Sequence, residues 1–194
     1  DLVQTDEQKY LGVTISSDLK WNTHISNITS KANRSLGLVK RSLHMCHQKA
    51  KSLAYNSLVR SHLEYSSSVW DPFTNENINK LESIQHRAAR FVTRNYDWNV
   101  PGASITSQLG WKTLEQRRQG HRLKLMYQAA TGQSGLKMSK YLPEKNTRVT
   151  RQCCHDLSYI PSHTRTDTYR HSFFPKTHDC NSLLPELVAC KSLD

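Results

Sequence analysis

The chain has 194 residues, which is enough for one well-packed core and a loosely ordered extension. Lysine and arginine outnumber aspartate and glutamate by 27 to 16, so the formal net charge is +11. A balance this basic favours a polyanionic partner, most often nucleic acid, although a generic basic surface has the same composition. No apolar stretch approaches the roughly 20 residues that cross a bilayer, and no secretory signal is present. We therefore expect no membrane partner and an intracellular location, in the nucleus or the cytoplasm.

The cysteines number five, an odd count, and their spacing matches no disulfide framework. Reduced thiols in an intracellular protein fit this pattern better than disulfide bonds do. The chain begins at Asp1, inside a patterned segment and without methionine, so we expect it to be part of a longer protein. No feature of the sequence indicates an oligomeric state.

The first predicted element is a β-strand or hairpin within residues 1–16. Apolar and polar residues alternate from Lys9 to Ile15, which is typical of a half-buried strand. A long helix is expected next, because apolar residues recur at spacings of three and four. This stripe consists of Trp21, Ile25, Ile28, Ala32, Leu36, Val39 and Leu43. Between Leu19 and Leu63 there are eight Lys or Arg and no Asp or Glu, so this helical region should carry a strong positive field.

Two further helices are predicted before residue 95. For the second, over residues 48–63, the expected inward-facing residues are Ala50, Leu53, Ala54, Ser57 and Leu58. The third opens between Thr74 and Asn77, and its apolar stripe consists of Ile78, Leu81, Ile84, Ala88, Phe91 and Val92. Arg87, Arg90 and Arg94 lie on a different face of that helix, at a spacing that lets all three reach one phosphate backbone.

A fourth helix is expected after a turn at Pro101 and Gly102. Thr113 and Gln116 form a capping-box pattern at its start, and Gly132 is placed to end it. After residue 132 apolar residues thin out and helical periodicity is lost. We therefore expect an irregular, partly disordered tail with one short helix near residues 184–190.

Together these elements predict a mainly α fold, with a short N-terminal strand or hairpin, a three- to four-helix bundle and an irregular C-terminal tail. The expected domains are the strand segment 1–16, the helical domain 17–132 and the basic tail 133–194. The rings of Tyr65, Trp70 and Trp111 have apolar neighbours in the sequence. Core packing is therefore expected for them rather than stacking on nucleic-acid bases.

Several short segments of the sequence, taken in their order along the chain, resemble segments of a known protein family. They are Lys9-Tyr10-Leu11-Gly12-Val13-Thr14-Ile15, Leu19-Lys20-Trp21-Asn22-Thr23-His24-Ile25, Leu63-Glu64-Tyr65, Leu81-Glu82-Ser83-Ile84-Gln85-His86-Arg87-Ala88-Ala89-Arg90, the segment from Trp111 to Arg118, and Tyr169-Arg170-His171-Ser172-Phe173-Phe174-Pro175. In this order they resemble the region after the catalytic palm in the reverse transcriptase of a non-LTR (LINE-type) retrotransposon. The resemblance covers most of the chain.

The resemblance implies that the chain holds nucleic acid, an RNA–DNA hybrid or another duplex. The strand would be the end of the palm, where the primer's 3′ end is supported, and the helices would be the thumb that grips the primer–template duplex. Thumb contacts go to phosphates and sugars, because a polymerase must accept any sequence. The positions carried over as nucleic-acid-binding are Tyr10, Leu11, Gly12, Lys31, Arg34, Arg41, Arg87, Arg90 and Arg94. For any single basic residue a solvated helix face is an equally good interpretation, and binding is favoured for the set.

Polymerase chemistry is not expected from this chain alone. The reaction needs carboxylates that hold two metal ions, and the family places them in a Tyr-x-Asp-Asp motif. This chain has no adjacent pair of aspartates. We therefore predict no catalytic residue and no cofactor in the chain. The parent would be an RNA-directed DNA polymerase whose Mg²⁺ is expected in the missing palm.

Two alternatives stay open. The first is a stand-alone or relic helical interaction module whose basic surface is incidental. The second is a structural zinc in the tail, where soft ligands are frequent but lack the spacing of the usual zinc fingers. Ordinary tail residues are the favoured interpretation, so no metal site is assigned. The ligands concerned are Cys153, Cys154, His155, His163, His171, His178 and Cys180.

Overall fold

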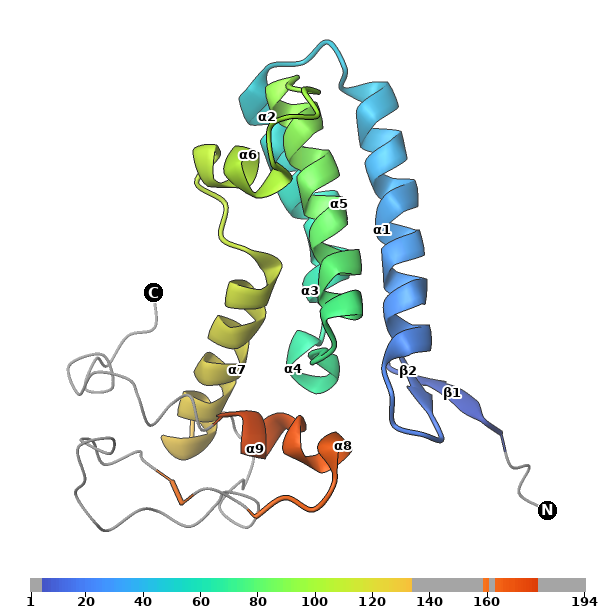
Figure 1. The fold of residues 1–194 in the computed structure, drawn as a ribbon, viewed down its shortest axis with the longest axis vertical. Helices are drawn as coiled ribbons and strands as arrows, with labels where there is room; N and C mark the ends of the chain where they lie inside the picture. Colours follow the sequence, from blue (N-terminus) through green and yellow to red (C-terminus); the bar gives the residue numbers. More distant parts are fainter. Residues whose placement is uncertain (1–4, 134–158, 161–162, 178–194) are drawn as a thin grey trace. The chain divides into compact units, whose positions relative to one another are not determined.

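The computed structural model describes residues 5–133, 159–160 and 163–177 (Figure 1). The chain forms two compact units, Asp1–Arg118 and Gln119–Asp194. The fold is mainly α, as predicted, with a two-stranded hairpin followed by several helices. The predicted domain limits after residues 16 and 132 stay a prediction.

The first unit begins with an antiparallel hairpin of β1 (Glu7–Tyr10) and β2 (Val13–Ser16). The turn consists of Leu11 and Gly12 alone, because the residues on either side of it are paired. Both turn residues have positive φ angles, 45° and 86°. A two-residue turn that follows the twist of its strands requires this conformation. Glycine adopts it freely, whereas leucine does so rarely.

Three helical segments pack together in the first unit: α1 (Asn22–Ser42), the segment from α2 to α3, and α5 (Asn75–Thr93) (Figure 1). The apolar stripes predicted for α1 and α5 are confirmed, because every member except the half-buried Ile78 is buried or packed against the core. Burial of these stripes contributes most of the stability of such helices. The buried members are Ile25, Ala32, Leu36, Val39, Leu81, Ile84, Ala88, Phe91 and Val92.

The middle segment consists of α2 (Gln48–Ala54), a π-helical turn η1 (Tyr55–Val59) and α3 (Arg60–Glu64). The inward face predicted for it is largely wrong: Ala54 packs against the core, but Ala50, Leu53, Ser57 and Leu58 are exposed. The residues that it buries recur at every fourth position instead. They are Lys51, Tyr55, Val59 and Leu63.

Tyr55 explains this register. Its ring stacks on Trp111 with the ring centroids 4.5 Å apart, and its hydroxyl donates to Gln85 Oε1 at 2.9 Å. The Gln85 Nε2 donates in turn to the carbonyl oxygen of Lys112 at 2.9 Å. An aromatic ring buries a large apolar area, and its hydroxyl needs a partner once it is buried. The tyrosine therefore takes the core side, and the leucines remain in solvent.

Two short helices, α4 (Ser67–Trp70) and α6 (Gly102–Gln108), are not predicted by the sequence patterns. The Trp70 side chain in α4 is fully buried, as expected. Helix α6 packs on α5, and a Cβ at Gly102 would lie 2.6 Å from the ring of His86. Only glycine therefore permits this approach of α6 to α5.

Helix α7 (Leu114–Ala130) begins with the predicted capping box, and the boundary between the units falls within it. The Thr113 N–H donates to Gln116 Oε1 at 3.2 Å, and the Gln116 N–H donates to Thr113 Oγ1 at 3.1 Å. The pair satisfies amides that a helix start leaves without intrahelical partners. Gly132 follows the helix with a φ of 73°, which agrees with the predicted end.

The described part of the second unit contains two one-turn helices that the sequence does not predict, α8 (Asp167–Arg170) and α9 (Phe173–Lys176). Thr166 caps α8, because its Oγ1 accepts a hydrogen bond from the Tyr169 N–H at 3.3 Å. A small apolar cluster of this unit consists of Leu123, Met126, Ala130, Tyr159, Phe173 and Phe174. The helix predicted near residues 184–190 lies outside the described residues.

Candidate nucleic-acid interface

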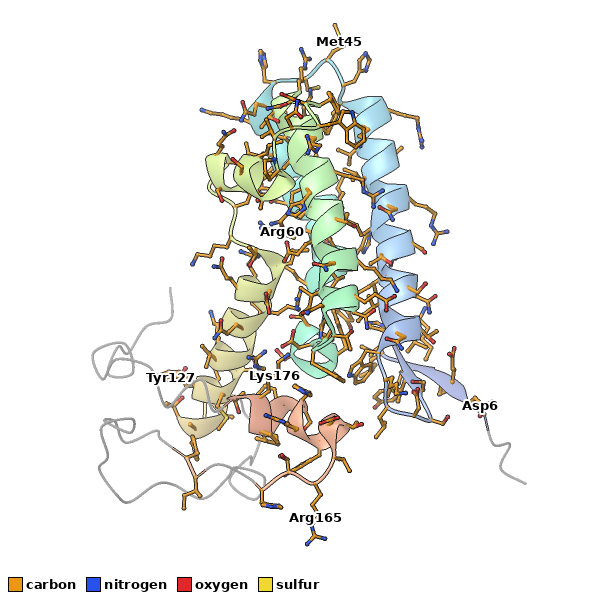
Figure 2. The ribbon with its side chains drawn as sticks, viewed as in Figure 1. Asp6, Met45, Arg60, Tyr127, Arg165 and Lys176 are labelled. Atoms are coloured by element: carbon orange, nitrogen blue, oxygen red, sulfur yellow. The ribbon has the colours of Figure 1, made fainter. Side chains whose placement is uncertain are left out.

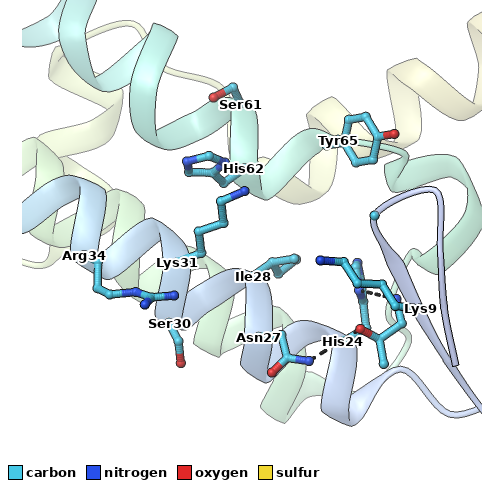
Figure 3. Close-up of a pocket in the computed structure, with 12 residues that line it drawn as sticks. Lys9, His24, Asn27, Ile28, Ser30, Lys31, Arg34, Ser61, His62 and Tyr65 are labelled. Carbon is cyan, nitrogen blue, oxygen red and sulfur yellow. Dashed lines mark hydrogen bonds between the residues drawn. The ribbon is translucent and has the colours of Figure 1, made fainter. Parts of the chain in front are cut away.

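Figure 2 shows the described side chains on the ribbon. A hollow of about 630 Å³ opens between the hairpin, α1 and α3 of the first unit, and we call it the hairpin hollow (Figure 3). Its size is in the range of roughly 300–1,000 Å³ that is common for ligand sites. None of the described residues that line it carries a carboxylate, whereas several are basic. The lining residues are Lys9, Gly12, Thr14, His24, Asn27, Ile28, Ser30, Lys31, Arg34, Ser61, His62 and Tyr65.

Tyr65 fixes the hairpin turn beside α3. Its hydroxyl donates to the carbonyl oxygen of Leu11 at 2.9 Å. Its ring lies 3.3 Å from the place that a Cβ of Gly12 would occupy, so glycine serves both the turn and this close contact. The side chain of Tyr65 is 56% exposed, and the expectation of core packing is therefore wrong for this ring.

His24 joins β2 to α1 beside the hollow. The Thr14 N–H donates to its Nδ1 at 3.1 Å, and its ring packs against Trp70 with centroids 5.3 Å apart. Burial lowers the pKa of His24 below its ordinary value. An Nδ1 that accepts a hydrogen bond then places the proton of the neutral ring on Nε2, where no described residue accepts it. His24 therefore positions the hairpin on α1 and adds no charge to the hollow near neutral pH.

The positive charge of the hollow comes from Lys9, Lys31 and Arg34. None of the three makes an ion pair or a hydrogen bond with another side chain in the described part of the chain. Lys31 extends from α1 toward His62 of α3 (Figure 3). Burial lowers the pKa of His62, and the charge of Lys31 lowers it further. The hollow therefore holds three cations whose hydrogen-bond donors are available to an anion.

The arginines predicted on α5 are engaged within the protein. None of them lines the hairpin hollow, and each donates to oxygens of the chain itself. The contacts of Arg90 and Arg94 fix neighbouring segments beside α5, because backbone carbonyls left without partners attract the donors of a guanidinium. The acceptors are Asn33 Oδ1 for Arg87, the carbonyls of Asp97 and Val100 for Arg90, and the carbonyl of His44 for Arg94, at 2.7 or 2.9 Å.

Of the predicted binding residues, the hollow brings together Gly12, Lys31 and Arg34. Tyr10 and Leu11 are exposed on the hairpin without lining the hollow. Arg41 is exposed in the last turn of α1. These positions stay predictions, and the structure adds the basic hollow as a place where three of them meet.

Several residues of the hollow were not singled out as binding residues from the sequence. Most of them lie in or close to a segment that carries the family resemblance, and that signal does not indicate which side chains share a cavity. Lys9 begins the first of these segments, His24 lies within the second, and Tyr65 ends the third. The added residues with polar side chains are Lys9, Thr14, His24, Asn27, Ser30, Ser61, His62 and Tyr65.

Metal and membrane features were searched in the same ranges. Among the described residues, no three His, Cys, Asp or Glu side chains lie close enough together to hold a metal ion. Of the soft tail ligands, His163 and His171 are described and the others lie outside the described residues. No helix in the described ranges combines the length and the apolar character that a bilayer crossing needs.

Scans of protein-family models, curated protein sequences and solved structures find no match to this chain. The hairpin hollow and its three available cations are thus the features from which a function can be inferred.

Proposed function

We propose that this chain is the part of a retrotransposon RNA-directed DNA polymerase that follows the palm, and that it holds the primer–template duplex by sequence-independent backbone contacts. The observation that carries the proposal is the hairpin hollow, where Lys9, Lys31 and Arg34 meet without a carboxylate. In this proposal the hairpin is the end of the palm and the helical bundle is the thumb. The polymerase chemistry and its Mg²⁺ belong to a palm outside this chain.

Phosphates are the groups that these cations suit. Lys31 and Arg34 are three residues apart on α1 and therefore share one face of the helix. That spacing allows them to contact neighbouring phosphates of one strand, while Lys9 approaches from the hairpin. Contacts to phosphate give affinity and register but carry no sequence information. A polymerase that copies any template needs contacts of this kind.

A binding titration of the full chain tests the proposal. Two RNA–DNA hybrids of unrelated sequence are compared between about 50 and about 200 mM salt. We expect equal affinity for the two sequences. Three phosphate contacts predict an affinity that falls roughly 40-fold over that range of salt, since each contact adds about −0.9 to the logarithmic salt slope.

The double variant Lys31→Ala with Arg34→Ala should reduce that slope by about two units. A matched control, Lys49→Ala with Lys112→Ala, removes the same charge from exposed residues outside the hollow and should change the slope much less. Equal losses in the two doubles would overturn the hollow as the binding site. Absent or salt-independent binding would favour the helical interaction module instead.

A further inference from the structure

A second hollow of about 230 Å³ lies between α1, α5 and the loop that follows α5, and we call it the tryptophan hollow. It is smaller than the roughly 300 Å³ at which pockets for drug-sized ligands begin, so it suits one planar ring. Its lining combines three cations with two aromatic rings, the combination on which proteins hold unpaired nucleotides. The lining residues are Lys40, Arg87, Arg90, Tyr96 and Trp98.

The loop that carries the two aromatic rings is fixed in place. Arg90 donates through its two Nη atoms to the carbonyl oxygens of Asp97 and Val100, both at 2.7 Å. Within the loop, the Asp97 N–H donates to Asn95 Oδ1 at 3.0 Å, and the Asn99 N–H donates to Asp97 Oδ1 at 2.9 Å. Side-chain turns of this kind hold a loop in one conformation. The rings are therefore positioned before any ligand arrives, which lowers the entropy cost of binding.

Trp98 is 95% exposed on this fixed loop. An exposed indole leaves a large apolar surface in water and contributes no packing to the core. Its position next to other binding groups then indicates a contact with a ligand. Tyr96 is exposed beside it. An accessible aromatic face next to cations is a platform on which a base of any sequence can stack.

The cations of this hollow have donors available for a phosphate. Lys40 and Arg87 form no ion pair with a described residue. Arg87 uses Nε and Nη2 for internal hydrogen bonds, which leaves the two N–H groups of Nη1. Burial lowers the pKa of Lys40, and the nearby charge of Arg87 lowers it further. The carboxylate of Asp97 accepts from Asn99 and pairs with neither cation, so an anion between Lys40 and Arg87 would relieve their repulsion.

We propose that the tryptophan hollow binds one nucleotide of single-stranded nucleic acid, with the base stacked on Trp98 and the adjacent phosphate held by Lys40 and Arg87. The site is additional to the hairpin hollow and shares no lining residue with it. Either proposal can therefore fail without the other. Base and phosphate are common to RNA and DNA, and the test includes both.

The test measures tryptophan fluorescence while oligothymidylate or oligouridylate, each of about 10 nucleotides, is added to the full chain. Stacking should quench the fluorescence of Trp98. Trp98→Leu should remove this quenching and weaken binding about 10-fold, while Trp98→Phe, which keeps a ring, should retain most of the affinity. Lys40→Gln should lower the logarithmic salt slope for these single strands by about 0.7. Preference for one oligomer identifies the strand type, and either preference supports the site.

Two results would overturn the site. Because Trp98 is exposed, the Trp98→Leu variant should keep the thermal unfolding midpoint of the parent. The first contradicting result is that this folded variant binds both oligomers with unchanged affinity. The other is a blunt duplex that quenches Trp98 as strongly as a single strand does. The Lys31→Ala with Arg34→Ala double variant separates the two sites, because it should lose duplex affinity and keep the quenching by single strands.

Discussion

The hairpin hollow and the arginines of α5 carry the same kinds of cation and use them differently. Lys31 and Arg34 find no acceptor among the described side chains, whereas Arg90 donates to two carbonyls of its own chain. The spacing of three residues is the same on both helices. The difference comes from what lies opposite: the described part of the chain presents no acceptor to Lys31 and Arg34, whereas Arg90 lies beside a loop whose carbonyls need donors. Charge spacing predicts a basic face, and the acceptors opposite decide whether the face binds its own chain or a ligand.

Arg118 extends the comparison to full burial. Its side chain is 1% exposed, and its Nε donates to Asp71 Oδ1 at 2.8 Å. These basic residues of the first unit form a series of decreasing contact with the rest of the protein. It runs from Arg118 inside the core, through Arg90 at the edge of a loop, to Lys31 and Arg34 in the hollow. Along that series, the effect of a substitution on stability should fall and its effect on nucleic-acid binding should rise.

Replacement of Asp71 by alanine should have the largest effect on stability. The change leaves the Arg118 guanidinium buried without its carboxylate, which should lower the free energy of unfolding by about 3–5 kcal/mol. Urea unfolding followed by circular dichroism measures this loss. Glu76→Ala is the matched control, because Glu76 forms an exposed ion pair with Lys80 and its loss should change stability far less. Similar results for the two variants would contradict the buried position of the Arg118 pair.

Arg90→Ala should have the next largest effect. It removes two charge-assisted hydrogen bonds to the loop after α5 and should lower the free energy of unfolding by about 2 kcal/mol. The released loop should also alter the fluorescence of Trp98. Arg41→Ala, at an exposed position in the last turn of α1, serves as the control. An Arg90 variant as stable as the Arg41 variant would show that the two carbonyl contacts do not fix the loop.

Acid should weaken the junction between the hairpin and α1 through His24. Burial lowers its pKa in the folded state, while the unfolded chain has the ordinary value of about 6.5. The unfolded chain therefore binds more protons between these two values, and the free energy of unfolding falls as pH drops from about 6.5 through the folded-state pKa. Above that window the stabilisation is fully present.

The His24→Phe variant isolates this contribution. Thermal unfolding midpoints of the variant and the parent are compared from about pH 7.5 to about pH 5. The parent should lose stability more steeply on acidification, because protonation of Nδ1 breaks its hydrogen bond from the Thr14 N–H. His62, whose pKa burial also lowers, is present in both proteins, so its contribution cancels in the difference. Parallel curves would mean that His24 titrates at its ordinary pKa.

Lys31→Ala with Arg34→Ala should have the smallest effect on stability. Neither side chain has a partner among the described residues, so the free energy of unfolding should stay within about 0.5 kcal/mol of the parent. Differential scanning fluorimetry without nucleic acid measures the change. A clear loss of stability would place these residues with Arg90, as internal anchors rather than ligand contacts.

Most of the fold could be predicted because it depends on neighbours in the sequence. The stripes of α1 and α5 and the capping box at Thr113 are local patterns, and the structure confirms them. The hairpin expected within residues 1–16 is present, although its turn at Leu11 and Gly12 interrupts the alternation from Lys9 to Ile15. The register of the middle helix failed because Tyr55 is held by Gln85 and Trp111, which lie far along the chain. No local window contains that contact.

The candidate site could be predicted only in part, for a related reason. Lys31 and Arg34 share a helix face, and their spacing alone suggests a common role. The contribution of His62 depends on how α3 packs against α1, and that of Tyr65 depends on how the hairpin turn docks beside it. For Arg90, the sequence pattern predicts the helix face on which the side chain lies but does not predict the two carbonyls that it contacts.

The most direct test of the central claim is lysine acetylation of the intact chain with and without an RNA–DNA hybrid, read residue by residue by mass spectrometry. A duplex in the hairpin hollow should protect Lys9 and Lys31 strongly, while Lys49 and Lys112, exposed elsewhere, should react at the same rate in both samples. Protection of all four lysines to the same degree, or of none at saturating hybrid, would contradict the assignment of the hairpin hollow as the duplex site.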